Sequence, residues 1–170
     1  MKRLVVHISA LLLTLTTFSA QASPVLMSSD WGRLACRAWN AQPVLTKGLA
    51  ESEWVINDRG RGHKVIHLYR SECTESPRLE LRISEKDGQA KCVYGGRIET
   101  DLDLGVDYIL HADTEHWREM GRGEYGPIWA IATFKLSFTG PELEALANSQ
   151  ALEQFLRLIG RVPATHQSCP

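Results

Sequence analysis

The sequence predicts an α+β domain in which helices pack on one face of an antiparallel sheet of five to six strands. Apolar residues recur at helical spacing near the start and the end of the chain, and the segments between them alternate apolar and polar residues as strands do. Asp87-Gly88 separates two of these segments and is typical of a tight hairpin turn. Neither a repeat nor a low-complexity linker interrupts the pattern, which indicates one domain.

Residues 1–22 have the three regions of a secretory signal peptide: the basic pair Lys2-Arg3, a mostly apolar stretch from Leu4 to Ala20, and a small-x-small sequence that ends at Ala22. An uncleaved anchor or a buried helix is the alternative, but the apolar stretch is short and interrupted by polar residues. We therefore expect cleavage near Ala22, a domain formed by residues 23–170, and a periplasmic or secreted product.

Net charge limits the partners of this domain. The whole chain has a net charge of −1, and removal of residues 1–22 takes away two basic and no acidic residues, which leaves −3. A mildly acidic protein is a poor electrostatic partner for nucleic acid, so we expect no nucleic-acid binding.

The first predicted helix begins at Ser29-Asp30, which can cap its N-terminus, and ends before Pro43. Its apolar face consists of Trp31, Leu34, Ala35, Ala38 and Trp39. Strand alternation then follows in 65–69 and most clearly in 79–84, with a hairpin partner at 91–94 and further strands at 107–112 and 134–139.

The last third of the chain contains the remaining helices. Asp113 can cap a helix whose early face holds Trp117 and Met120, and Pro127 suits the first position of a short helix. A final amphipathic helix begins after Gly140-Pro141 and ends at Gly160. The glycine-rich segment 121–126 between the helices fits either a mobile entrance to a cavity or a surface turn.

All four cysteines follow the predicted signal peptide, which in an oxidising compartment indicates two disulfides. Four cysteines allow three pairings, and the sequence alone does not choose among them. Our preferred pairing joins Cys73 to Cys92 around the predicted hairpin and Cys36 to Cys169, which ties the tail to the first helix. A zinc site is not expected, because the chain has no C-x-x-C pair.

The order of elements resembles the sterol carrier protein type 2 domain family. The resemblance rests on Asp107-Tyr-Ile-Leu-His-Ala-Asp113-Thr-Glu-His-Trp117, on the segment from Gly126 to Gly140, and on Phe155-Leu-Arg-Leu-Ile159. Trp39-Asn-Ala-Gln-Pro43 and Lys47-Gly-Leu49 also fit the first helix of the family. Phe134 stands where the family usually has a glycine, and the two cysteines between residues 70 and 96 are unusual for a mainly intracellular family.

The resemblance implies a five-stranded sheet with helices over one face, an apolar tunnel, and the binding of a sterol, fatty acyl or phospholipid chain without a metal or nucleotide cofactor. Periodicity alone assigns the apolar residues of the last third to an ordinary core. With the resemblance they become candidates for the lipid-binding wall: Trp117, Met120, Ile128, Trp129, Ile131, Phe134, Leu136, Phe138, Phe155 and Ile159.

Other chemistry has weaker support. His111 and His116 flank Asp113 and Glu115, but this cluster is better explained by a helix N-terminus than by a metal or acid–base site. We predict no catalytic residue and no metal site, because no hydrolase, zinc-protease or phosphate-loop motif is present. Arg59, Arg61, His63 and Lys64 form a basic cluster that fits a solvated turn or a contact with anionic lipid head groups.

Three functions therefore remain open. The first is an exported lipid-binding or lipid-transfer protein, with transient contact to a membrane surface. The second is a non-enzymatic envelope interaction module whose core is filled by its own side chains. The third is a hydrolase or transferase with an unrecognised site.

Overall fold

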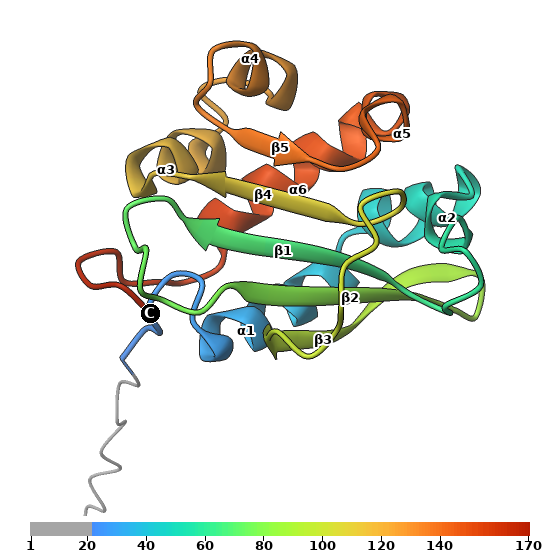
Figure 1. Cartoon of the computed structure of the whole chain (residues 1–170), viewed down its shortest axis with the longest axis horizontal. Coiled ribbons are helices and arrows are strands. Elements are labelled where there is room, and N and C mark those ends of the chain that lie inside the picture. Colours follow the sequence, from blue (N-terminus) through green and yellow to red (C-terminus); the bar gives the residue numbers. More distant parts are fainter. Residues whose placement is uncertain (1–21) are drawn as a thin grey trace, which may run out of the picture.

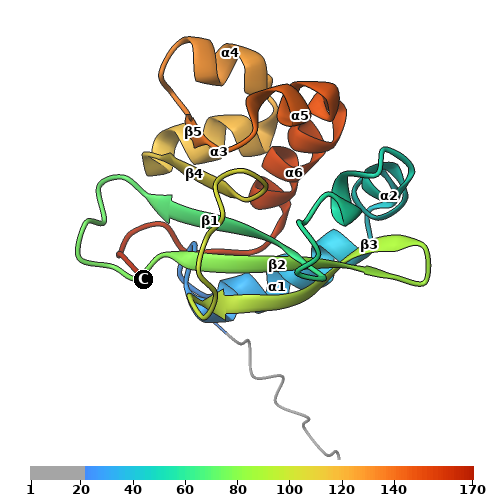
Figure 2. The same ribbon diagram turned by 45° about the vertical axis from the view of Figure 1, so that its right-hand side comes forward.

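The structure, a computed structural model, describes residues 22–170, so that the predicted signal peptide lies outside the described residues apart from Ala22. One five-stranded sheet, in the order β3-β2-β1-β4-β5, carries α1 and α6 on one of its faces (Figures 1 and 2). The elements in chain order are α1 (Ser29–Asn40), the π-helical turn η1 (Val44–Gly48), α2 (Leu49–Glu51), the 3₁₀ turn η2 (Trp54–Ile56), β1 (Lys64–Arg70), β2 (Leu79–Lys86), β3 (Gln89–Arg97), β4 (Tyr108–Ala112), α3 (Thr114–Arg122), α4 (Pro127–Ala132), β5 (Ser137–Thr139), α5 (Glu142–Ala147) and α6 (Ser149–Arg161).

The predicted α+β class and helical layer are confirmed, but the sheet is mixed rather than antiparallel. Strand β1 pairs with β4 in parallel, with Ile66 opposite Tyr108, while the other pairs are antiparallel. The segment 98–107 carries the chain from the edge strand β3 back across the sheet, so that β4 enters from the same end as β1 (Figure 1). In the described part of the chain, no helix is long and apolar enough to cross a membrane.

The β2–β3 hairpin forms where the sequence predicts it. Asp87 and Gly88 both have positive φ, at 52° and 71°, which matches the primed turn that joins two twisted strands. Lys86 and Gln89 close the hairpin as a register pair. This local signal therefore placed both strands correctly.

The N-cap of α1 is Ser28, just before the predicted cap at Ser29-Asp30, and its hydroxyl accepts a hydrogen bond from the backbone N–H of Trp31. The predicted apolar face is confirmed: Trp31, Ala35 and Trp39 are buried. The indole of Trp39 donates to the carbonyl of Ala90 in β3 at 2.9 Å, which fixes the helix against the sheet.

Helices α3 and α6 cross at two glycines. A Cβ added to Gly121 would lie 2.6 Å from Cα of Gly160, so only glycine allows the two backbones to come this close. Gly123, with φ 74°, ends α3. This part of the glycine-rich segment is therefore a tight helix crossing and a helix end, rather than a cavity entrance. Pro127 starts α4 as predicted.

The last strand is shorter than predicted, because β5 contains only Ser137–Thr139. Phe134 is not part of the alternating strand: its φ is 59° and its side chain is 92% exposed. This left-handed conformation is the one that glycine adopts most readily.

The preferred disulfide pairing is wrong. The disulfides join Cys36 to Cys92 and Cys73 to Cys169. The register of the hairpin places Cys92 opposite Ile83, in the middle of β2, whereas Cys73 precedes the start of that strand. Cys92 lies against α1, where Cys36 is its neighbour, with 5.2 Å between their Cα atoms. Cys73 lies beside the C-terminal tail instead.

The C-terminal tail is held at the end of the sheet. Arg70, at the end of β1, donates to the carbonyls of Ser168 at 2.6 Å and His166 at 3.1 Å. The backbone of Leu26 donates to the carbonyl of Thr165, so that the two ends of the described chain lie side by side.

Candidate functional site

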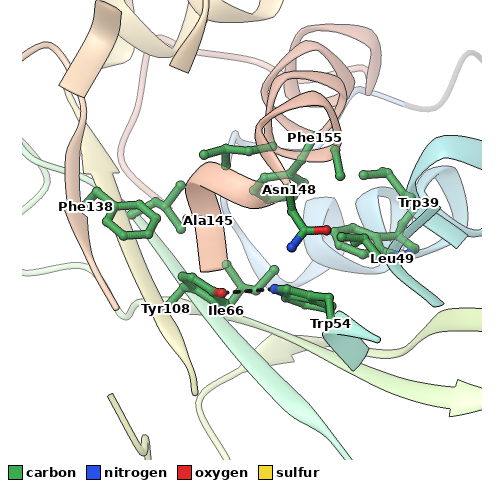
Figure 3. A pocket seen from close by; sticks show the side chains of 13 residues that line it. Trp39, Leu49, Trp54, Ile66, Tyr108, Phe138, Ala145, Asn148 and Phe155 are labelled. Carbon is green, nitrogen blue, oxygen red and sulfur yellow. Dashed lines mark hydrogen bonds between the residues drawn. The ribbon is translucent and has the colours of Figure 1, made fainter. Parts of the chain in front are cut away.

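The candidate site is a cavity between the sheet and the helices that cover it (Figure 3). Its wall comes from α1, the turns after it, three strands and the last two helices. The lining residues are Trp39, Leu45, Leu49, Trp54, Ile66, Tyr108, Leu110, Phe138, Ala145, Asn148, Ala151, Leu152 and Phe155.

Aromatic rings form a continuous part of this wall. The ring of Trp39 lies 5.6 Å from that of Phe155 and 6.5 Å from that of Trp54, measured between centroids. Trp54 stacks on Tyr108 at 5.9 Å, and Tyr108 lies 5.6 Å from Phe138. Such rings supply large apolar area in fixed positions, so this wall suits an apolar ligand.

The cavity is narrow. Its empty volume is about 410 Å³, which includes the part that opens to solvent, but only about 50 Å³ is wide enough for the centre of a water molecule. A single water needs roughly 10–15 Å³ by that second measure, so the interior has room for a few waters.

One edge of the cavity is polar. The Glu144 carboxylate of α5 accepts hydrogen bonds from the Lys64 ammonium at 2.6 Å and from the Tyr108 hydroxyl. Asn57 donates its side-chain amide to the other carboxylate oxygen at 2.6 Å. Trp54 donates to the Tyr108 hydroxyl at 3.0 Å, the bond drawn in Figure 3. The apolar wall and this polar edge therefore meet at Tyr108 and Trp54.

The charges at this edge are strongly influenced by burial. Burial lowers the pKa of the Lys64 ammonium, and the hydrogen bond and charge of Glu144 oppose that shift. Burial also raises the pKa of the Tyr108 phenol, and its hydrogen bond to Glu144 acts in the same direction. Tyr108 therefore stays neutral at physiological pH and acts as a hydrogen-bond donor to the carboxylate.

Comparison with known proteins gives a fold. No protein-family model matches the chain, and no curated protein matches its sequence. A crystal structure of sterol carrier protein 2 superposes with a TM-score of 0.53 at 17% identity, over 81% of this chain and 98% of that chain. This chain has the sterol carrier protein 2 fold.

A second solved structure agrees. The solution structure of a conserved hypothetical protein from Thermus thermophilus, described as possibly a sterol carrier protein, matches with a TM-score of 0.51 at 16% identity. The match covers 86% of this chain and 96% of that one. The predicted resemblance to the sterol carrier protein 2 fold is thus confirmed for nearly the whole length of both relatives.

The sterol carrier protein 2 fold brings only two of the ten predicted wall residues to this cavity, Phe138 and Phe155. Three others, Trp117, Met120 and Leu136, belong to the solid core and are at most 1% exposed. These residues follow the apolar periodicity correctly, but their side chains are surrounded by other protein atoms.

The other five predicted wall residues lie elsewhere. Ile128 and Trp129 of α4 are about half exposed and line a shallow hollow beside α6, and Phe134 points into solvent. Ile131 packs against the edge of the core. Ile159 is buried beside a separate hollow near the C-terminal tail.

Sequence reasoning missed most of the wall. Trp39 lies on the predicted core face of the first helix, and Trp54 begins the apolar triplet Trp54-Val55-Ile56, but neither pattern indicates that the ring faces a ligand. It also missed the burial of Lys64, which the basic-cluster interpretation placed in a solvated turn or at a membrane surface. Lys64 is fully buried because it shares the core face of β1 with Ile66 and Leu68, which follow at every second position.

Two other members of the basic cluster, Arg59 and Arg61, form ion pairs within the chain. Arg61 forms two hydrogen bonds with the buried Asp107 carboxylate, at 2.6 and 2.8 Å, and Arg59 pairs with Asp103. The hydrogen bond with Asp107 raises the pKa of Arg61, so the guanidinium stays charged. Two of the basic groups are thus engaged in holding the segment 98–107.

The histidine cluster does not come together as a site. Within residues 22–170, no group of three or more His, Cys, Asp or Glu side chains is placed to hold a metal ion. Asp113 occupies the N-cap position of α3, as predicted, without a side-chain capping bond. His111 instead contacts the hydroxyl of Ser71 at 2.9 Å and stacks on Tyr69.

Proposed function

We propose that this protein is an exported lipid-binding or lipid-transfer protein that holds an apolar chain in the cavity between the sheet and α6. The observation that carries the proposal is the continuous aromatic and aliphatic wall with a single polar edge. Each methylene group moved from water into such a wall contributes about 0.8 kcal/mol. A sterol, fatty acyl or phospholipid chain is the expected class of ligand, and the narrow interior favours an acyl chain among these.

Export is supported by the two disulfides and by the predicted leader. Disulfides persist in the periplasm or outside the cell and are rare in reducing compartments. Both bridges join segments far apart in the chain, with sequence separations of 56 and 96 residues. Each therefore stabilises the fold only where it stays oxidised.

The character of the wall favours a carrier over an enzyme. Among the described residues that line the cavity, polar side-chain atoms come only from Trp39, Trp54, Tyr108 and Asn148. Their donor groups already have partners within the chain, so the wall offers a ligand mainly apolar surface, which suits a binding protein.

Transient contact with a membrane surface is part of this proposal. Leu143 and Leu146 of α5 are 84% and 56% exposed, beside the lining residue Ala145. Exposed leucines on a short helix next to a lipid cavity are placed to contact acyl chains during loading. Sedimentation with lipid vesicles tests this, because Leu143→Asp with Leu146→Asp should abolish any association of the wild-type protein.

The narrow interior supports one second candidate, an envelope interaction module whose core is filled by its own side chains. Native mass spectrometry of the protein purified from its oxidising compartment separates the two. The carrier retains a stoichiometric lipid that solvent extraction removes and an acyl probe replaces. A protein that arrives empty and binds no acyl probe would exclude the carrier.

A pair of variants on one short helix sharpens the experiment. Ala145→Trp places a ring in the cavity, whereas Ala147→Trp places the same ring on the exposed side of α5. We expect the first to lose binding of an acyl probe by tenfold or more and the second to retain it. Equal binding by both would place the ligand outside this cavity.

A further inference from the structure

The polar edge of the cavity contains three hydrogen-bond donors that converge on one carboxylate. We name Asn57, Lys64 and Tyr108 the carboxylate seat, because their side chains all donate to the Glu144 carboxylate. Both carboxylate oxygens are engaged, one by Asn57 and the other by the remaining two donors. The seat is therefore already arranged for a planar group with one negative charge.

The carboxylate seat borders the space proposed for the ligand chain. The rings of Tyr108 and Trp54 line the cavity, and the Lys64 nitrogen lies 4.5 Å from the Trp54 ring centroid and 5.3 Å from that of Tyr108. Asn148 also lines the cavity and donates its side-chain amide to the Glu144 carbonyl at 2.9 Å. A chain that fills the aromatic part of the cavity thus brings its head group to the seat.

Lys64 needs an anion, because its side chain is fully buried. Removing one partner of such a pair typically costs about 3–5 kcal/mol, since the other charge is left buried without compensation. Exchange of one carboxylate for another avoids that cost, because the number of charges in the site stays the same. A dianionic head group adds a charge that the single ammonium does not balance.

The carboxylate that now fills the seat comes from a weakly packed element. None of the residues of α5 is buried, and its Leu143 and Leu146 are exposed. Its contacts to the rest of the protein include the polar bonds of Glu144, and Asn148, the residue after the helix, accepts a hydrogen bond from the Ser52 hydroxyl at 2.6 Å. Little apolar burial therefore opposes an outward turn of this helix.

We propose that Glu144 occupies the position of a ligand carboxylate, and that a long-chain fatty acid displaces it from Lys64, Tyr108 and Asn57. As Glu144 leaves, α5 turns away from the sheet and opens the cavity for the chain. This inference rests on the proposed lipid-binding function and adds to it the head group, the site that holds that group and the helix that moves.

The test compares hexadecanoic acid with hexadecanol, which has the same chain without the charge, by titration of delipidated protein. The wild type should bind the acid more tightly. Lys64→Met should lower the ratio of acid to alcohol affinity by about thirtyfold, as expected for loss of a buried charged partner. Glu144→Gln removes the competing carboxylate and should strengthen acid binding by about tenfold.

A matched control lies elsewhere in the chain. Glu119 of α3 lies away from the cavity and accepts hydrogen bonds from Lys135 and Tyr125, as Glu144 does from Lys64 and Tyr108. Glu119→Gln should leave the ratio of acid to alcohol affinity unchanged. If Lys64→Met or Glu144→Gln does not fold, the double variant Lys64→Met with Glu144→Leu replaces the pair by apolar groups, and it should bind both ligands equally.

The outcomes separate this inference from the proposed function. If the wild type binds neither compound, the carrier itself is wrong. If the wild type binds both and its ratio of acid to alcohol affinity is the same in Lys64→Met and Glu144→Gln, the proposed carrier function stands and the carboxylate seat is wrong. If hexadecyl phosphate binds the wild type as tightly as the acid does, the restriction to a carboxylate is wrong.

Discussion

The bridge between Cys36 and Cys92 should contribute a large share of the stability of the domain. It closes a loop over a sequence separation of 56 residues. Restricting the unfolded chain by a loop of that length is worth about 4 kcal/mol in the chain-entropy model. Domains of this size typically have an unfolding free energy of about 5–15 kcal/mol, so the loss is easily measured.

The experiment replaces both cysteines by alanine and measures urea unfolding of the oxidised protein, with the other bridge intact. The free energy of unfolding should fall by about 4 kcal/mol. Replacing Cys73 and Cys169 instead, with a separation of 96 residues, should cost about 0.5 kcal/mol more, because the loop is longer. A loss below about 1 kcal/mol for the first pair would refute the reasoning, as would a peptide map that links Cys36 to Cys169.

Three further predictions concern the sheet and its edges. Burial lowers the pKa of His67 in the folded protein. On acidification the imidazole therefore takes up a proton more readily in the unfolded chain, and stability should fall as the pH drops below about 6.5. His67→Phe should reduce this slope in urea unfolding at several pH values, whereas a gain of stability on acidification would show that Glu80 controls the ring instead. Gly95→Ala places a Cβ 2.2 Å from a backbone oxygen of α1 and should cost about 1–3 kcal/mol, and an unchanged melting temperature would contradict that contact. Phe134→Gly relieves a positive φ at an exposed side chain, so its unfolding free energy should stay the same or rise by up to about 1 kcal/mol; a clear fall would show that the ring is packed.

Elements with a local signal were predictable from the sequence. The face of α1 follows from the spacing of Trp31, Ala35 and Trp39, and the hairpin follows from Asp87-Gly88. The parallel pairing of β1 with β4 and the cysteine pairing were not predictable in this way. The strand pairing depends on where the segment 98–107 returns the chain, and its sequence carries no periodicity that reveals its path. The cysteine pairing depends on how α1 and the C-terminal tail pack against the sheet.

The cavity wall was less predictable than the fold. Periodicity shows that Trp117 and Phe155 are buried, but it does not show which buried side chain faces a gap, because that depends on how α1, the turns and α6 meet. The signal for Lys64 was present in the sequence. Lys64, Ile66 and Leu68 occupy every second position and therefore share the inner face of a strand. A lysine on that face requires a carboxylate partner.

The pairing of the four cysteines has a consequence for how the protein matures. In chain order the bridges connect the first cysteine to the third and the second to the fourth, so the two loops overlap. If the protein is exported as proposed, with its N-terminus first, Cys36 and Cys73 are the first two thiols to reach the oxidising side, and they are not native partners. Cys73 must then stay reduced, or exchange a first partner by thiol–disulfide exchange, until Cys169 arrives.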